Sequence, residues 1–182
     1  FVVILLRLRC IFVLTKNHNT LAVKFFRPTS DTLRVVSSMS FAIWKPPQPN
    51  VDSDVSVSDE VRFIERKCWD LSKVIEAVKE GSLTVELTTK AQNESFKELR
   101  YSYADVVAFL KNLGARHYVN SQWCLPPYGA NLHAPYPADS YTMGFNRFTQ
   151  QENTRLEPYP YIKFTVVEEA KKVLVFSMHP PR

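Results

Sequence analysis

The chain has 182 residues, of which 45% are hydrophobic, so it fits one domain of ordinary size with extensions. Its formal net charge of +5 comes from residues 1–38, which hold six basic residues and one acidic residue. The stretch 39–99 is acidic and the remainder mildly basic, so a phosphate-binding face is permitted but not demanded. With four glycines, the chain has no Gly-rich phosphate loop, which argues against nucleotide-driven chemistry.

The N-terminal stretch differs in character from the rest. Residues 1–14 are apolar except for two arginines and a cysteine, so they are too short and too interrupted for a membrane span of about 20 residues. The first methionine is Met39, and two interpretations of residues 1–38 stay open: upstream sequence carried into the reading frame, or an arm that binds a membrane or a partner. Residues 45–58 are typical of an extended or disordered linker. We therefore assign 1–58 to an extension and linker, and 59–182 to a single domain with no membrane partner.

Helical periodicity dominates the first part of this domain. Apolar residues spaced three and four apart from Val61 to Val78 predict one amphipathic helix, or two abutting helices broken near Asp70. Gly81 is expected to end this helical stretch as a C-cap. The alternation of apolar and polar residues in 83–87 then predicts a short half-buried strand.

Two further helices are expected before residue 115. A small helix fits residues 92–100. Ser102, with Asp105 three residues later, predicts the start of the clearest helix in the chain, and an apolar face follows. Gly114 is expected to stop that helix.

After Gly114 the pattern becomes that of strands. Proline-rich residues 125–137 cannot pair as a central strand and are expected to form a loop. Helices followed by an antiparallel meander predict an α+β fold, with two or three helices on one face of a three- to four-stranded, mainly antiparallel sheet. The expected strands are 115–124, 139–147, 161–167 and 173–179, the last two joined by a charged turn.

The cysteines and histidines lead to predictions about the cellular compartment and about cofactors. The three cysteines, Cys10, Cys68 and Cys124, are odd in number and widely spaced, which favours a reducing compartment and a cytoplasmic protein. The histidines of the domain have neither helix spacing nor acidic neighbours in sequence, so we expect no metal site and no cofactor. No Gly-x-Ser-x-Gly elbow of a serine hydrolase occurs.

Polar and aromatic residues gather in the β half of the domain. Such a set can hold single-stranded RNA, because bases stack on tyrosine and phosphates pair with arginine or lysine. It can also cleave RNA without a metal, because the 2′-hydroxyl attacks its neighbouring phosphate and the protein need only move protons and stabilise a dianionic phosphorane. The alternative is that these are ordinary sheet aromatics and rim charges. The set comprises Arg116, His117, Tyr118, Gln122, Tyr128, His133, Tyr136, Tyr141, Arg147, Arg155, Tyr159, Tyr161, Lys163 and His179.

The C-terminal hairpin carries a family resemblance. Residues 161–167, a short turn and residues 173–178 resemble the closing hairpin of the MqsR (motility quorum-sensing regulator) family of toxin endoribonucleases. The preceding order of elements is similar too, so the likeness covers about residues 70–182, although it is specific only in the hairpin. The resemblance implies a compact, RelE-like α+β fold, cleavage of messenger RNA, and neutralisation by a cognate antitoxin protein.

The resemblance also points to individual positions. Tyr161 matches the family's active-site tyrosine, and Lys163 matches the lysine two residues later. The family lysine that follows a Phe-Tyr pair falls here on Val119, or on Thr142 under the other alignment. The family glutamine near a tryptophan has no clear match, because Gln122 and its neighbouring tryptophan stand in the reversed order.

The sequence thus predicts a metal-independent endonuclease that cuts messenger RNA as part of a toxin-antitoxin module. Its expected partners are RNA and the antitoxin, with no DNA bound directly. The alternative is a small non-enzymatic interaction protein whose loop 126–137 docks a partner. The predicted catalytic residues are Tyr161, Lys163, His117 and Tyr141, and the predicted RNA-binding residues are Tyr118, Arg116, Arg147 and Arg155.

Overall fold

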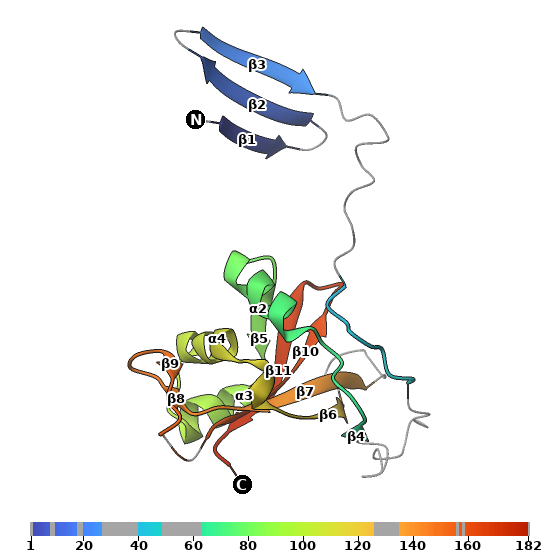
Figure 1. The fold of residues 1–182 in the computed structure, drawn as a ribbon, viewed down its shortest axis with the longest axis vertical. Coiled ribbons are helices and arrows are strands. Elements are labelled where there is room, and N and C mark those ends of the chain that lie inside the picture. The colour runs from blue at the N-terminus through green and yellow to red at the C-terminus, as the bar shows by residue number, and fades with distance from the viewer. Residues whose placement is uncertain are drawn as a thin grey trace. The chain divides into compact units, whose positions relative to one another are not determined.

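A computed structural model shows two compact units, residues 1–39 and 40–182 (Figure 1). It describes residues 2–7, 10–17, 20–26, 40–48, 63–125, 135–155, 157 and 159–181. The first unit is an antiparallel meander in the order β1-β2-β3, for which the sequence analysis proposed no strands. Its strands are β1 (Val2–Arg7), β2 (Cys10–Asn17) and β3 (Thr20–Phe26).

The second unit is built on a six-stranded sheet in the order β4-β6-β7-β10-β11-β5. All neighbouring strands are antiparallel except β5 and β11, which run parallel. The α+β class and the mainly antiparallel sheet are confirmed, but the sheet has more strands than the three or four expected. The strands are β4 (Phe63–Ile64), β5 (Thr84–Leu87), β6 (Tyr118–Cys124), β7 (Tyr136–Thr142), β10 (Tyr161–Val167) and β11 (Lys172–His179), and a separate hairpin joins β8 (Phe145–Asn146) and β9 (Gln151–Glu152).

The first helix of the domain is shorter than expected. Helix α2 (Leu71–Glu80) begins where the Asp70 side chain accepts a hydrogen bond from the Lys73 N–H, and it ends at Gly81 with a φ of 77°. Glycine adopts this left-handed conformation without steric cost, so the C-cap prediction is confirmed. Residues 63–70 do not begin the helix, because 63–64 pair as β4.

The remaining helices begin at or near the residues that the sequence predicts. Helix α4 (Tyr103–Asn112) starts with a capping box in which the Ser102 and Asp105 side chains bond each other's backbone N–H, as predicted. The small helix expected at 92–100 begins earlier, as α3 (Thr89–Asn93), and continues as a π-helix, η2 (Glu94–Glu98). A 3₁₀ turn, η3 (Ala115–His117), leads into β6.

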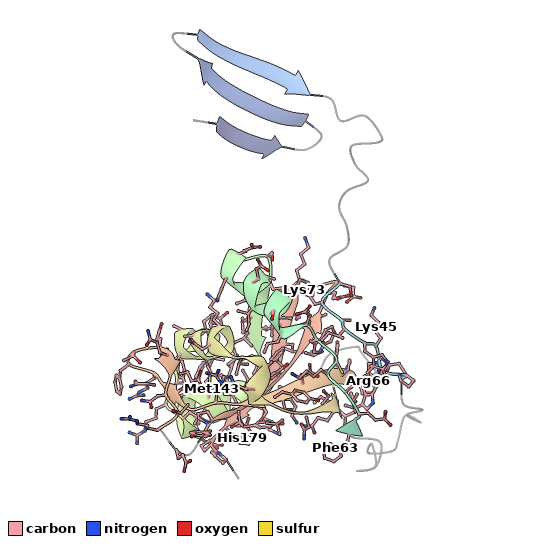
Figure 2. The ribbon with its side chains drawn as sticks, viewed as in Figure 1. Lys45, Phe63, Arg66, Lys73, Met143 and His179 are labelled. Atoms are coloured by element: carbon pink, nitrogen blue, oxygen red, sulfur yellow. The ribbon has the colours of Figure 1, made fainter. Side chains whose placement is uncertain are left out.

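The main core lies between the helices and one face of the sheet. Phe109 and Leu110 of α4 are fully buried, as are Ile162 and Phe164 of β10. The same cluster includes Met143, which is 1% exposed. Figure 2 labels its side chain. Three strand residues, Ala138, Leu174 and Phe176, form a second, smaller apolar cluster.

Residues 40–48, which the sequence analysis assigned to the linker, contact the domain. The Phe41 N–H donates to Glu168 Oε1 at 2.7 Å, and the Phe41 carbonyl accepts from the Asp70 N–H at 2.8 Å. The Ile43 N–H donates to the Cys68 carbonyl at 2.8 Å. The extended segment therefore behaves as part of the second unit.

Removal of residues 1–39 is expected to leave residues 40–182 with one cooperative unfolding transition, because the two units are separate in their internal contacts. The matched deletion of 1–48 should unfold at lower urea, since Phe41, Ala42 and Trp44 pack against the core. Urea denaturation followed by circular dichroism measures both. A 40–182 fragment without a cooperative transition would contradict the expectation.

The Cys68 thiol is a core group. It is 1% exposed, and burial, with the neighbouring Asp139 carboxyl adding to it, raises the pKa of the Cys68 thiol to about 12. The thiolate is the reactive form of cysteine, so the folded protein should keep Cys68 unmodified at neutral pH. Brief treatment with a maleimide, followed by peptide mass mapping, should label the half-buried Cys124 before Cys68. Equal labelling of the two in the folded protein would refute this.

Candidate active site

Strand β10 separates core residues from a second set that faces away from the helices. Ile162 and Phe164 are fully buried, whereas Tyr161 and Lys163 between them are partly exposed. Side chains alternate between the two faces of a strand, so Tyr161 and Lys163 share a face. The Lys163 Nζ lies 6.0 Å from the centre of the Tyr161 ring. The expected placement of these two residues on one side is confirmed.

A hydrogen-bond network fixes the Tyr161 hydroxyl across three neighbouring strands. The hydroxyl donates to Ser140 Oγ at 2.7 Å, and it accepts from Gln122 Nε2 at 3.2 Å. Ser140 is fully buried and Gln122 is 6% exposed, so both partners sit in a low-dielectric environment. The phenol is therefore held in one orientation, and its proton is already committed to Ser140.

His179 stands beside Tyr161 because the two residues are register partners in the β10–β11 hairpin. Their rings stack with centroids 5.0 Å apart and an interplanar angle of 25°. The ring Nδ1 of His179 contacts the carbonyl oxygen of Pro180. A carbonyl can only accept, so this contact is a hydrogen bond when Nδ1 carries the proton, and in that neutral tautomer Nε2 is the acceptor.

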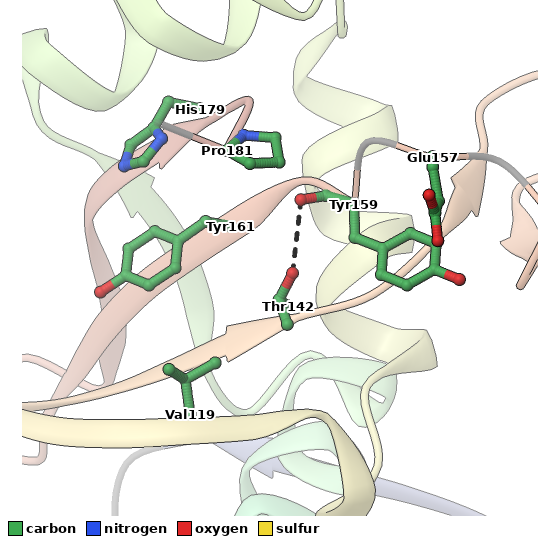
Figure 3. Close-up of a pocket in the computed structure, with 7 residues that line it drawn as sticks. All are labelled: Val119, Thr142, Glu157, Tyr159, Tyr161, His179 and Pro181. Carbon is green, nitrogen blue, oxygen red and sulfur yellow. Dashed lines mark hydrogen bonds between the residues drawn. The ribbon is translucent and has the colours of Figure 1, made fainter.

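An open pocket of about 780 Å³ lies against this stacked pair (Figure 3). On the wall facing the rings, the Thr142 hydroxyl donates to the backbone carbonyl of Tyr159 at 3.3 Å. The volume falls within the range of pockets that hold small organic ligands. Both positions at which the family lysine could align, Val119 and Thr142, line it. The lining residues are Val119, Thr142, Glu157, Tyr159, Tyr161, His179 and Pro181.

Tyr141, a predicted catalytic residue, lies on the core face instead. It is fully buried, and its ring stacks on Phe164 with centroids 5.5 Å apart and an interplanar angle of 11°. Burial, together with the nearby Asp139, raises the pKa of the Tyr141 hydroxyl far above its ordinary value. Tyr118, predicted to bind RNA, packs edge-on against Tyr141, and its hydroxyl bonds Ser121 Oγ at 2.8 Å. Neither tyrosine lines the pocket.

His117 and Arg116 form a separate polar cluster with Glu152 of β9. His117 is 8% exposed; its Nδ1 accepts from the Gly114 N–H at 2.9 Å, and its Nε2 lies 3.2 Å from Glu152 Oε1. Arg116 pairs with the other carboxylate oxygen of Glu152. Burial raises the pKa of Glu152, but the hydrogen bonds from Arg116 and His117 outweigh it and lower the pKa overall. These contacts tie η3 to β9, and the cluster is not part of the pocket wall.

Of the two remaining predicted RNA-binding residues, Arg147 lies in the turn between β8 and β9, and Arg155 follows β9. Arg147 Nη1 donates to the Arg100 carbonyl at 2.7 Å, and its guanidinium lies 4.7 Å from the Phe148 ring centre. Arg155 follows β9 and is exposed. Neither lines the pocket, so of the eight predicted site residues Tyr161 lines the pocket and Lys163 lies beside the Tyr161 ring.

Sequence reasoning placed Gln122 and His179 in the polar and aromatic set but not among the predicted site residues, and it did not single out Ser140. They come from three different strands, and the tyrosine at 161 is their common contact. The signal for His179 was the hairpin itself, because a short turn between 167 and 172 pairs the start of one strand with the end of the next. Gln122 and Ser140 had no such local signal, since their pairing depends on strand order.

The described residues contain neither a metal-holding cluster nor a membrane-spanning helix. Within them, no group of three or more His, Cys, Asp or Glu side chains is placed to hold a metal ion. No helix of the described part is long and apolar enough to cross a membrane. In comparisons with known proteins, neither a family model nor a curated protein nor a solved structure matches this chain.

Proposed function

We propose that the protein is a metal-independent endoribonuclease of toxin type that cleaves messenger RNA in the cytoplasm. The observation that carries the proposal is the stacked Tyr161–His179 pair at an open pocket, with the Lys163 ammonium group beside it. A base, a cation and an aromatic surface are what strand cleavage through the 2′-hydroxyl requires.

The chain's own residues divide this chemistry between them. Nε2 of His179 removes the proton from the 2′-hydroxyl, whose oxygen attacks the adjacent phosphorus while the bond from phosphorus to the 5′-oxygen breaks. The Lys163 ammonium group offsets the charge of the phosphorane and donates a proton to the departing 5′-oxygen. The products are a 2′,3′-cyclic phosphate and a 5′-hydroxyl, so atoms and protons balance without a metal or a cofactor.

Tyr161 serves mainly as a support in this scheme. Its hydroxyl donates to Ser140 and accepts from Gln122, which ties its ring to β6 and β7. The ring in turn keeps His179 at a stacking distance of 5.0 Å. The resemblance to the MqsR family motivated a tyrosine at this position, and the hydrogen bonds supply a physical reason for it.

The direct test uses the purified full chain and a mixed messenger RNA substrate. We expect cleavage products that end in a cyclic phosphate, and no cleavage of the same RNA when every 2′-hydroxyl is methylated. A cognate antitoxin protein is part of the proposal: induced expression should arrest growth, and a small protein encoded beside the gene should relieve the arrest. Wild-type protein that neither cuts RNA nor affects growth would favour the interaction-module alternative, whose loop 126–137 lies largely outside the described residues.

Chelation is expected to leave the reaction unchanged. The proposed base and cation are His179 and Lys163, and the chemistry assigned to them needs no Lewis acid. The cleavage rate in excess EDTA should equal that in its absence, and the melting temperature should not shift. Loss of either with EDTA and recovery with zinc would reveal a metal site that this proposal lacks.

A further inference from the structure

The last residues of β11 pair with β10 on one side, as far as His179, but β5 does not reach them on the other side. Strand β5 pairs with β11 only along Lys172–Val175. Strand ends with unpaired backbone groups fray or need other partners. In this protein Thr88 and Glu94 supply those partners.

Thr88 continues the edge where β5 stops. Its N–H donates to the Val175 carbonyl at 3.0 Å, and its hydroxyl donates to the Phe176 carbonyl at 3.1 Å. Glu94 accepts hydrogen bonds from the next two residues of β11. Its Oε2 accepts from Ser177 Oγ at 2.6 Å and from the Met178 N–H at 3.0 Å.

Glu94 is an unusual residue to find in this place. Its side chain is 4% exposed, and an acidic group is rarely so buried unless its oxygens are hydrogen-bonded. It opens the π-helix η2, in which the Leu99 N–H donates to the Glu94 carbonyl at 3.2 Å. Short π-helical turns inside helices occur frequently at functional sites. The buried carboxylate thus acts as a substitute for a strand against the Met178 backbone.

We propose that Glu94 is a positioning residue that holds the end of β11, and thereby keeps the His179 ring stacked on Tyr161 at the pocket. Met178 and His179 are consecutive, so the hydrogen bond to the Met178 N–H fixes the backbone from which the imidazole extends. The kinetic part of this inference rests on the proposed ribonuclease function. The structural part, a fixed strand end and a fixed imidazole, does not.

Two substitutions of Glu94 change its charge and the length of its side chain separately. Both donors point at one oxygen, Oε2, which an amide oxygen can replace in Glu94→Gln. In Glu94→Asp the charge remains, but the oxygen is drawn back by one methylene and loses the Met178 N–H. Lys90, the neighbouring cation, is 3.9 Å from the other carboxylate oxygen and largely exposed, so it should depend little on either change. A positioning role therefore predicts that glutamine rescues and aspartate fails.

Two measurements test the structural part on the full chain. Hydrogen exchange at the Met178 amide should accelerate about tenfold in Glu94→Asp, the equivalent of one net hydrogen bond, and stay within about threefold of wild type in Glu94→Gln. The ¹⁵N spectrum of His179 should show the Nδ1-protonated tautomer in wild type and Glu94→Gln, and a mixture in Glu94→Asp. Glu98→Asp and Glu98→Gln, on the exposed part of the same π-helix, are the matched controls and should change neither signal.

The kinetic part follows from the same variants. In Glu94→Asp we expect kcat for RNA cleavage to fall about 10- to 100-fold with KM nearly unchanged, because a displaced base costs rate more than binding. Glu94→Gln should remain within about threefold of wild type. If Glu94→Asp does not fold, Ser177→Ala removes one of the two donors and should give a smaller rise in Met178 exchange.

The outcomes separate the two proposals. A glutamine variant that loses both the Met178 protection and the His179 tautomer would overturn the positioning role, and so would an aspartate variant that retains them. A wild-type protein that cuts no RNA would sink the ribonuclease proposal alone, because the exchange and tautomer measurements do not depend on cleavage.

Discussion

Replacing Asp139 by alanine should destabilise the domain by about 3 kcal/mol or more. Its Oδ1 accepts from the Cys68 N–H at 3.0 Å and from Ser121 Oγ at 2.6 Å, and its Oδ2 accepts from the Trp69 N–H at 3.1 Å. Asp139 is fully buried, so alanine leaves the Cys68 and Trp69 N–H groups without partners, while Ser121 Oγ keeps its contact with the Tyr118 hydroxyl. Each buried, unsatisfied donor costs about 1–3 kcal/mol.

Urea denaturation of the wild type and of Asp139→Ala measures this loss. Asp70→Ala is the matched control, because it removes an aspartate that accepts from the backbone at a partly exposed helix N-cap. A lost N-cap costs about 0.5–2 kcal/mol. If Asp139→Ala costs no more than this control, the buried carboxylate does not organise the extended stretch at 68–69.

The same variant tests whether folding raises or lowers the pKa of Asp139. Burial raises the pKa of Asp139, and the hydrogen bonds from Ser121, Cys68 and Trp69 oppose that rise without cancelling it. The folded state therefore binds this proton more readily than the unfolded state does. The contribution of Asp139 to stability is largest below its unfolded pKa and declines as pH rises through its folded pKa. The difference in unfolding free energy between wild type and Asp139→Ala should accordingly shrink from acidic to neutral pH.

Asp139 also explains why the helix expected from Val61 begins only at Leu71. The apolar spacing from Val61 to Val78 fits a helix, and Ile64 and Cys68 are indeed buried. Their burial comes from strand β4 and an extended stretch, whose backbone N–H groups at 68 and 69 bond a carboxylate about 70 residues further along the chain. Periodicity registers which residues are buried, but it does not register a distant side chain that competes for the backbone donors.

Local signals succeeded where the partners are close in sequence. The capping box at Ser102 and Asp105 and the closing hairpin were both predicted, because each is made by residues within one turn or one hairpin. The extra strands of the sheet were not. Strand β4 has two residues, and the parallel pairing of β5 with β11 joins segments about 90 residues apart. Such pairings depend on global topology, for which a single short strand carries no signal.

The candidate site shows the same division. Alternation within β10 placed Tyr161 and Lys163 on one face, but the same logic applied to Tyr141 required knowing which face of β7 meets the core. Tyr141 alternates with Met143 and Phe145, and all three are buried, so the apolar pair was the local signal that this tyrosine faces inward. Gln122 and Ser140 became visible only once the order β6-β7-β10 was known.

Loss of His179 or Lys163 should reduce RNA cleavage by about 10²–10⁴-fold in kcat, the range typical of a removed acid or base. His179→Ala removes the proposed base, whose Nε2 is presented by the contact of Nδ1 with Pro180. Lys163→Ala removes the cation beside the Tyr161 ring. Neither residue belongs to the main core, so melting temperatures should stay close to that of the wild type.

Tyr161→Phe should behave differently from these two variants. It keeps the ring that stacks on His179 and deletes the hydroxyl, whose proton is already donated to Ser140. We expect a loss of less than about tenfold, whereas Tyr161→Ala, which removes the stacking partner, should approach the loss of His179→Ala. Lys172→Ala is the matched lysine control, since that residue lies at the other end of β11 and pairs with Glu86 at 2.8 Å.

Rates measured on a mixed messenger RNA, with melting temperatures alongside, decide between these roles. If Tyr161→Phe falls as far as His179→Ala while remaining folded, the phenol takes part in proton transfer and the supporting role assigned to it is refuted. If His179→Ala and Lys163→Ala stay folded and cut as fast as Lys172→Ala and the wild type, the pocket is not the site of cleavage. The interaction-module alternative would then be the better account of this sheet face.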